Sequence, residues 1–279
     1  MKVLFSIALF LIAFSAVAAQ DGGMALSPAR FELEMAPGTE TTVVVNLDYR
    51  SGEAARPARI VASLNDWTIT PEGRVEYFAA GTRRDSASPW LIYTPGQAVF
   101  TPGKVHQIRV TISVPANAAP GDHLAALVVE QRPETLKPDQ QNMRQVVVRY
   151  RMASVFYIKV AGLTRHGSFE NLTAESTDKG ILVTPTLKND GNSMVRPLAS
   201  VRVYDADGKL VAEMPALEPM PLLAGSETNQ GFLIEKRLGP GNYSIKYRVD
   251  FHDGQRPTEG VTDFDVKARP QIAATGRTP

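Results

Sequence analysis

The sequence predicts an all-β protein built from two immunoglobulin-like antiparallel β-sandwiches in tandem. Short segments alternate apolar and polar residues, as strands with one buried face do. Proline and glycine, 20 and 21 of the 279 residues, fall between these segments and mark turns. The segments form two successive sets, and the roughly 260 residues that follow a leader exceed what one small sandwich needs.

Residues 1–19 are predicted to be a secretory signal peptide. Lys2 supplies a charged start, an apolar run follows from Val3 to Phe14, and "SAVAAQ" offers small residues for cleavage. A membrane anchor is the competing interpretation, but about a dozen apolar residues fall short of the roughly 20 that span a bilayer. No later segment is long and apolar enough to span. We therefore expect an exported protein without a transmembrane segment, in the periplasm or, alternatively, on the cell surface or secreted.

The first sandwich is predicted over residues 24–160. Its segments are bounded by Pro and Gly at regular intervals, the pattern of an antiparallel sandwich. They cover residues 25–35, 41–49, 58–67, 74–78, 90–95, 104–114, 122–132 and 144–160.

The second sandwich is predicted over residues 164–267, after a short polar connection. Its segments cover residues 169–177, 180–190, 198–214, 228–236, 242–251 and 260–268. Within 198–214 the stretch "DADGK" predicts a hairpin, because Asp-Gly readily takes the positive φ values of a two-residue turn. The tail, 268–279, has no periodicity and is predicted to be disordered.

Charge and motifs argue against catalysis. Lys plus Arg total 30 and Asp plus Glu 29, so nothing indicates a nucleic acid or an acidic membrane as partner. The four histidines are scattered singly, and neither a Gly-x-Ser-x-Gly elbow nor a Gly-rich phosphate loop is present. We therefore predict a non-enzyme without catalytic residues, metal or cofactor. A glycan-acting enzyme would need a carboxylate pair such as Asp250 and Asp253.

The last strand of the first sandwich carries basic residues on one face. Arg149, Arg151 and Lys159 share one parity, and an apolar set that includes Met152 and Phe156 shares the other. One interpretation is a solvated face over a buried one. The other is a ligand-binding strand whose basic residues meet a carboxylate.

Three stretches resemble the periplasmic pilus-assembly chaperones, the PapD-like family. "ALSPARFEL" places Arg30 where the family has an Arg in its first strand. "WLIYTPGQAVFTPGKVHQIRV" carries the Thr-Pro, and "PGDHLAALVVEQRP" carries the Pro-x-Asp loop at Pro120 and Asp122. The chain departs from the family after that loop, where His123 follows, and near the end of the domain, where Ser154 stands at the place of a Lys.

This resemblance implies a periplasmic chaperone that binds pilus or surface-fibre subunits by donating a strand, for pilus assembly. The implied partners are pilin-like subunits and, as a further candidate, an outer-membrane usher. Two basic residues then hold the subunit's C-terminal carboxylate: Arg30 directly, with Arg151 the nearest basic residue to the second position. The implied donor strand presents Val146, Val148, Tyr150 and Met152 as its alternating apolar set.

The second set of strands also resembles a bacterial surface immunoglobulin-like module, in which an Asn-x-Gly-Asn turn joins two strands. That resemblance implies an alternative function, an exported cell-envelope or surface module that binds a partner protein or a polysaccharide. The two functions differ in one structural respect. In a module of this kind the last strand forms its backbone hydrogen bonds within its own sheet, whereas a donor strand leaves one edge unpaired.

Overall fold

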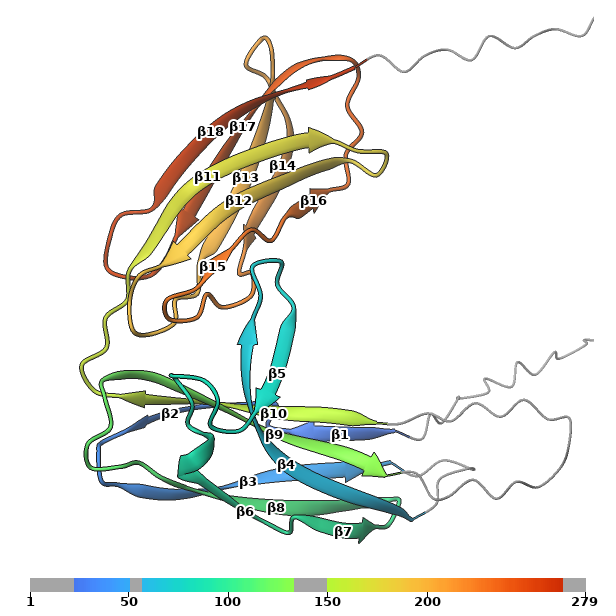
Figure 1. Cartoon of the computed structure of the whole chain (residues 1–279). Helices are drawn as coiled ribbons and strands as arrows, with labels where there is room; N and C mark the ends of the chain where they lie inside the picture. Colours follow the sequence, from blue (N-terminus) through green and yellow to red (C-terminus); the bar gives the residue numbers. More distant parts are fainter. Residues whose placement is uncertain (1–22, 51–56, 133–149, 268–279) are drawn as a thin grey trace, which may run out of the picture.

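The computed structural model describes residues 23–50, 57–132 and 150–267. The predicted signal peptide (1–19), the predicted tail (268–279) and the donor residues Val146 and Val148 lie outside the described residues. The predicted fold class is confirmed: the described chain forms two β-sandwiches in tandem (Figure 1). Within the same residues, no helix is long and apolar enough to cross a membrane.

The first sandwich packs two sheets against each other. One sheet has the order β1-β3-β8-β6, and the other the order β2-β10-β9-β4-β5 with β7 also on β4. Only the pairing of β2 with β10 is parallel among these neighbours. The strands are β1 (Met24–Ser27), β2 (Arg30–Met35), β3 (Glu40–Tyr49), β4 (Ala58–Ile69), β5 (Val75–Ala79), β6 (Leu91–Thr94), β7 (Gln97–Phe100), β8 (Lys104–Ser113), β9 (Gly121–Arg132) and β10 (Arg151–Val160).

The second sandwich packs the sheet β11-β12-β15, with β16 also on β12, against the sheet β14-β13-β17-β18. Its core includes Val183, Val203 and Tyr247, which alternate with less buried residues along their strands. The strands are β11 (Gly167–Ser176), β12 (Ile181–Asn189), β13 (Leu198–Asp205), β14 (Leu210–Leu217), β15 (Glu227–Thr228), β16 (Phe232–Ile234), β17 (Gly241–Asp250) and β18 (Thr258–Val266).

The predicted hairpin at "DADGK" joins β13 to β14, but its turn is longer than the two-residue turn that we expected. The amide of Asp205 donates to the Lys209 carbonyl, which leaves three residues between the closing pair. Within this turn only Gly208 has a positive φ, of 76°. The Asp205 carboxylate accepts from the amides of Asp207 and Lys209, and this side-chain capping stabilises the three-residue form.

The two sandwiches meet over an apolar cluster on the outer face of β10, β9 and β4. Trp67 and Tyr157 pack edge to face there, with ring centroids 5.2 Å apart, and the second sandwich adds Met194 and Leu223. A buried carboxylate, that of Asp122, accepts from the Ser193 hydroxyl at 3.0 Å and the Met194 amide at 2.7 Å. Burial raises the pKa of Asp122, although these two hydrogen bonds act in the opposite direction.

Candidate functional site

The site begins where the chain changes sheets near its start. Ser27 still pairs with Asn46 of the β1-β3 sheet, whereas Arg30 pairs with Val155 of the other sheet. Between them the Pro28 carbonyl accepts from the Ser154 hydroxyl at 2.7 Å, and the Ala29 carbonyl accepts from the Val155 amide at 2.9 Å. As a result β2 covers the edge of β10 only from Val155 onward.

The first residues of β10 therefore have an open edge. On one side Arg151 to Ser154 pair with β9, and on the other side no strand of the described chain pairs with them. The amide of Gln131 donates to the Tyr150 carbonyl, so the even-numbered residues direct their backbone groups toward β9. The backbone N–H and C=O groups of Arg151 and Ala153 consequently point toward the open side.

The apolar face of this strand is turned into the first sandwich. Phe156 and Ile158 are fully buried in its core, and Met152 packs against the same core at half exposure. Tyr150 is half-buried and immediately precedes β10. Of the four donor residues suggested by the resemblance, the structure places only Tyr150 and Met152.

Arg30 and Arg151 both project from the outer face but are not neighbours. Arg30 lies beside Val155, four residues along β10 from Arg151. This spacing amounts to roughly 13 Å along a strand. The structure thus places the two predicted anchors at separate points of the same face, with Ala153 between them.

A cluster of charges surrounds Glu32 on that face. Its carboxylate accepts from Lys159 Nζ at 2.8 Å and from Arg196 Nη2 at 2.7 Å, and Arg30 Nε lies 3.1 Å away. Arg196 belongs to the second sandwich and also pairs with Glu218 at 3.2 Å. Burial on its own raises the pKa of Glu32, but the hydrogen bonds and charges of Lys159 and Arg196 outweigh it, so the pKa is lowered.

The two interpretations of the basic face can now be compared with its geometry. Lys159 is not solvated, because only 11% of its side chain is exposed and its ammonium meets a carboxylate, that of Glu32. This carboxylate belongs to the chain itself. Arg151 is exposed, and its guanidinium carbon lies 5.7 Å from the centre of the Tyr77 ring, at a distance typical of a cation–π contact.

Tyr77 belongs to the β4-β5 hairpin, which stands out from the first sandwich toward the second (Figure 1). The tip of the hairpin touches the second sandwich, where the Pro71 carbonyl accepts from the Asn229 amide at 2.8 Å and the Thr228 hydroxyl at 3.0 Å. The hairpin therefore bridges the two sandwiches beside the open edge.

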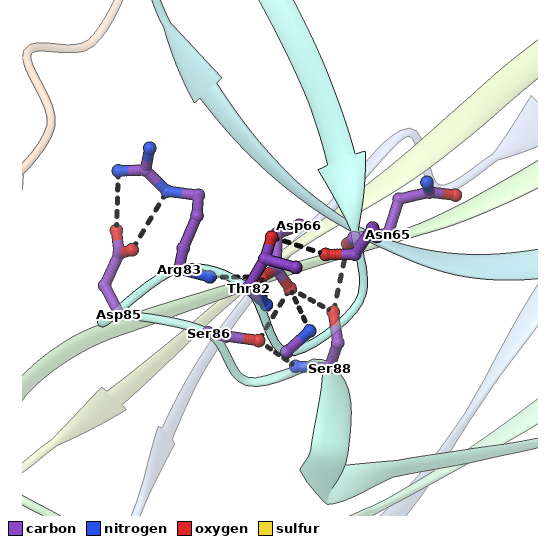
Figure 2. Close-up of polar contacts among 9 residues, drawn as sticks. Asn65, Asp66, Thr82, Arg83, Asp85, Ser86 and Ser88 are labelled. Carbon is purple, nitrogen blue, oxygen red and sulfur yellow. Dashed lines mark hydrogen bonds and ion pairs between the residues drawn. The ribbon is translucent and has the colours of Figure 1, made fainter.

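The base of the hairpin is fixed by a fully buried carboxylate, that of Asp66 (Figure 2). It accepts from the hydroxyls of Ser86 and Ser88 at 2.6 and 2.7 Å. It also accepts from three successive backbone amides, those of residues 81–83, at 3.2, 2.8 and 2.8 Å. Burial alone raises the pKa of Asp66, but these hydrogen bonds prevail and lower it.

Sequence reasoning missed Glu32, Arg196 and Asp66. Glu32 stands in an alternating strand where an outward carboxylate is ordinary, and Arg196 is 164 positions away from it. The only available signal for Asp66 was an acidic residue in a strand followed by a turn rich in Ser and Thr.

The carboxylates of Asp250 and Asp253 are both engaged by backbone amides. Asp250 accepts from the amide of His252, and Asp253 accepts from the amides of Gln255 and Gly167. No group of His, Cys, Asp and Glu in the described ranges could hold a metal ion.

Comparisons with known proteins find similar solved structures only. No family model matches the chain, and no curated protein matches it. A chaperone–tip adhesin complex of CFA/I fimbriae biogenesis is 11% identical, with 86% of this chain and 98% of that chain covered and a TM-score of 0.46. The CsuC–CsuE pre-assembly complex of Acinetobacter baumannii Csu pili is 15% identical, with 85% and 98% covered and a TM-score of 0.45.

A third similar structure is the Salmonella enterica SafA pilin in complex with the SafB chaperone. It is 13% identical, with 86% of this chain and 97% of that chain covered and a TM-score of 0.42. The solved structures similar to this chain thus include fimbrial chaperones.

Proposed function

We propose that this protein is a periplasmic chaperone that binds pilus or surface-fibre subunits by β-strand donation. The observation that carries the proposal is the open edge of β10 at Arg151 and Ala153. Main-chain groups on an open edge pair with an added strand and supply affinity without a particular side-chain sequence. A subunit that lacks one strand of its own sandwich fits this edge, because pairing with β10 supplies its sheet with the missing neighbour.

The direction of the apolar side chains supports the same function. Met152 lies on the face that packs against the core of the first sandwich, so a strand paired at the open edge places alternate residues beside Met152. Phe156 and Ile158 on the same face already lie beside residues of β2. We propose Val146, Val148, Tyr150 and Met152 as the donor set, although the first two lie outside the described residues. Arg30 and Arg151 then contribute charge at two points of the bound strand, with Arg30 as the anchor for a carboxylate.

The test uses proline to remove single backbone donors. In the pair of β10 with β9, Ala153 is at a position whose amide faces the open side, so Ala153→Pro removes an outward N–H and no hydrogen bond to β9. Ala153→Ser keeps that N–H and serves as the matched control. Both variants should show the same thermal unfolding as the wild type within a few degrees.

The mature wild type and both variants are used to capture partners from periplasmic extract. We expect the wild type and Ala153→Ser to retain a β-sandwich subunit, identified by mass spectrometry, and Ala153→Pro to lose it. Amides of Arg151 and Ala153 should also exchange hydrogen more slowly in the complex. Equal capture by Ala153→Pro would contradict strand donation at this edge, and capture of a glycan instead would favour the cell-envelope binding module.

A further inference from the structure

The β4-β5 hairpin presents a second open strand edge. All five residues of β5 are exposed, and in the described chain β5 pairs only with β4. Three of its side chains are large and apolar: Val75, Tyr77 and Phe78, which are 40%, 37% and 37% exposed. Such an edge is unusual in a soluble protein, because unpaired backbone groups beside apolar side chains favour pairing with another chain.

The backbone groups that face outward can be identified from the hairpin's own hydrogen bonds. The amide of Thr70 donates to the Arg74 carbonyl at 2.8 Å, which makes these residues a hydrogen-bonded pair. Pairing alternates from there, so Val75, Tyr77 and Ala79 occupy the positions that exchange no hydrogen bonds with β4. The N–H and C=O groups of Val75 and Tyr77 therefore point away from the hairpin and can pair with a further strand. At Ala79 the N–H points the same way, but the carbonyl already accepts from the Thr82 hydroxyl at 2.7 Å.

This edge is held in place at both ends. The tip is bonded to the second sandwich through the Pro71 carbonyl, and the base is held by the five hydrogen bonds to Asp66. Between them, Trp67 of β4 is 2% exposed and packs against Tyr157 of β10. An edge that is already ordered costs little conformational entropy when a strand binds to it.

The two open edges are adjacent. The guanidinium of Arg151, at the start of β10, lies over the ring of Tyr77 in the middle of β5. In Figure 1, β5 is the outer strand of the hairpin on the side from which β10 begins. The side chain of Arg151 thus spans the distance between the two strands. A domain bound at the open edge of β10 therefore lies close enough to contact β5 as well.

We propose that β5 is a second strand-pairing edge for the same subunit that binds at β10. This inference rests on the proposed function and adds a surface to it. The subunit places an edge strand of its sandwich along Val75, Tyr77 and Ala79, while the side chains of Tyr77 and Val75 contact apolar residues of that strand. Most of the recognition is main-chain pairing, so the edge accepts subunits of different sequence provided that they offer an unpaired, largely apolar strand.

The experiment compares Val75→Pro with Val75→Ala. Val75→Pro removes an outward N–H but no hydrogen bond to β4, whereas Val75→Ala shortens the side chain and keeps the N–H. The probe is the β-sandwich subunit that co-purifies with the wild type and is lost with Ala153→Pro. Thermal unfolding of both Val75 variants should match that of the wild type, which shows that the hairpin is intact.

We expect Val75→Pro to reduce the captured subunit by about tenfold and Val75→Ala to reduce it by less, with slower hydrogen exchange at Val75, Tyr77 and Ala79 in the wild-type complex. Full capture by Val75→Pro, together with loss by Ala153→Pro, overturns the inference and leaves the proposed function standing. Failure of the wild type to capture any subunit overturns both. A wild-type dimer that Val75→Pro dissociates, seen by light scattering, overturns the inference because the occupant is then a second copy of this chain.

Discussion

The carboxylate of Glu32 and the guanidinium of Arg196 lie 2.7 Å apart and join the two sandwiches directly. About a quarter of each side chain is exposed, 27% and 25%, so the pair is screened by water less than a surface pair. Because the bond crosses the junction, its loss should change the packing of one sandwich against the other as well as the free energy of unfolding.

A double-mutant cycle with Glu32→Gln and Arg196→Gln should therefore show coupling. We expect a coupling free energy of about 1–2 kcal/mol in denaturant unfolding, together with a change in Trp67 fluorescence, because Trp67 lies in the junction. The matched control is the exposed pair of Lys246 and Glu259 within the second sandwich, for which we expect a smaller coupling. Equal coupling in the two cycles would contradict a special role for the junction pair.

Asp66→Asn should destabilise the first sandwich strongly. The amide that replaces the carboxylate has one acceptor oxygen and directs N–H groups toward donors, which leaves buried donors unsatisfied. We expect a loss of about 3 kcal/mol in the free energy of unfolding, measured in urea. The control is Asp85→Asn, which breaks only a partly exposed ion pair with Arg83. A loss no greater than that of the control would show that the hydrogen bonds to Asp66 contribute little.

The same variant should change the response to acid. The folded pKa of Asp66 lies below the 3.8 of a free side chain, so its contribution to stability is present above about pH 4 and is lost as pH falls through the folded pKa. The deficit of Asp66→Asn relative to the wild type should consequently shrink between pH 7 and pH 3. Unfolding midpoints measured across this range test the point, and a constant deficit would contradict it.

Asp122→Asn should respond to acid with the opposite sign. Burial raises the folded pKa of Asp122 above 3.8, so the wild type gains stability from this group as pH falls through the folded pKa toward 3.8. The variant has no such gain, and its stability relative to the wild type should therefore decrease toward acid. A difference that moves in the same direction as that of Asp66→Asn would show that the hydrogen bonds from Ser193 and Met194 outweigh the burial of this carboxylate.

Much of the fold was predictable because the alternation of apolar and polar residues along a strand indicates which side chains are buried. Phe156 and Ile158 are buried where their parity places them, and Arg151 and Lys159 share the opposite face. The prediction of a two-residue turn at "DADGK" was wrong because it considered the backbone preference of Asp-Gly alone. It left out the Asp205 side chain, whose hydrogen bonds stabilise a three-residue turn.

The site was predictable only in part. The resemblance indicated Arg30 and Arg151, but parity and spacing do not show which cation a carboxylate of the chain already binds. Glu32 lies next to Lys159 because β2 pairs in parallel with β10, and it lies next to Arg196 because the two sandwiches pack together. Both relationships depend on tertiary structure. The outward edge of β5 likewise follows from the alternation of hydrogen bonds in the hairpin, which a single segment of sequence does not specify.

The change of sheet between Ser27 and Arg30 has a consequence for any strand added to β10. Such a strand lies where β2 would continue, so its end meets the chain at Ala29, whose carbonyl is already bonded to the Val155 amide. The guest cannot slide past this point. Ala29 therefore limits how far an added strand can extend along β10, and so fixes the register of that strand at one end.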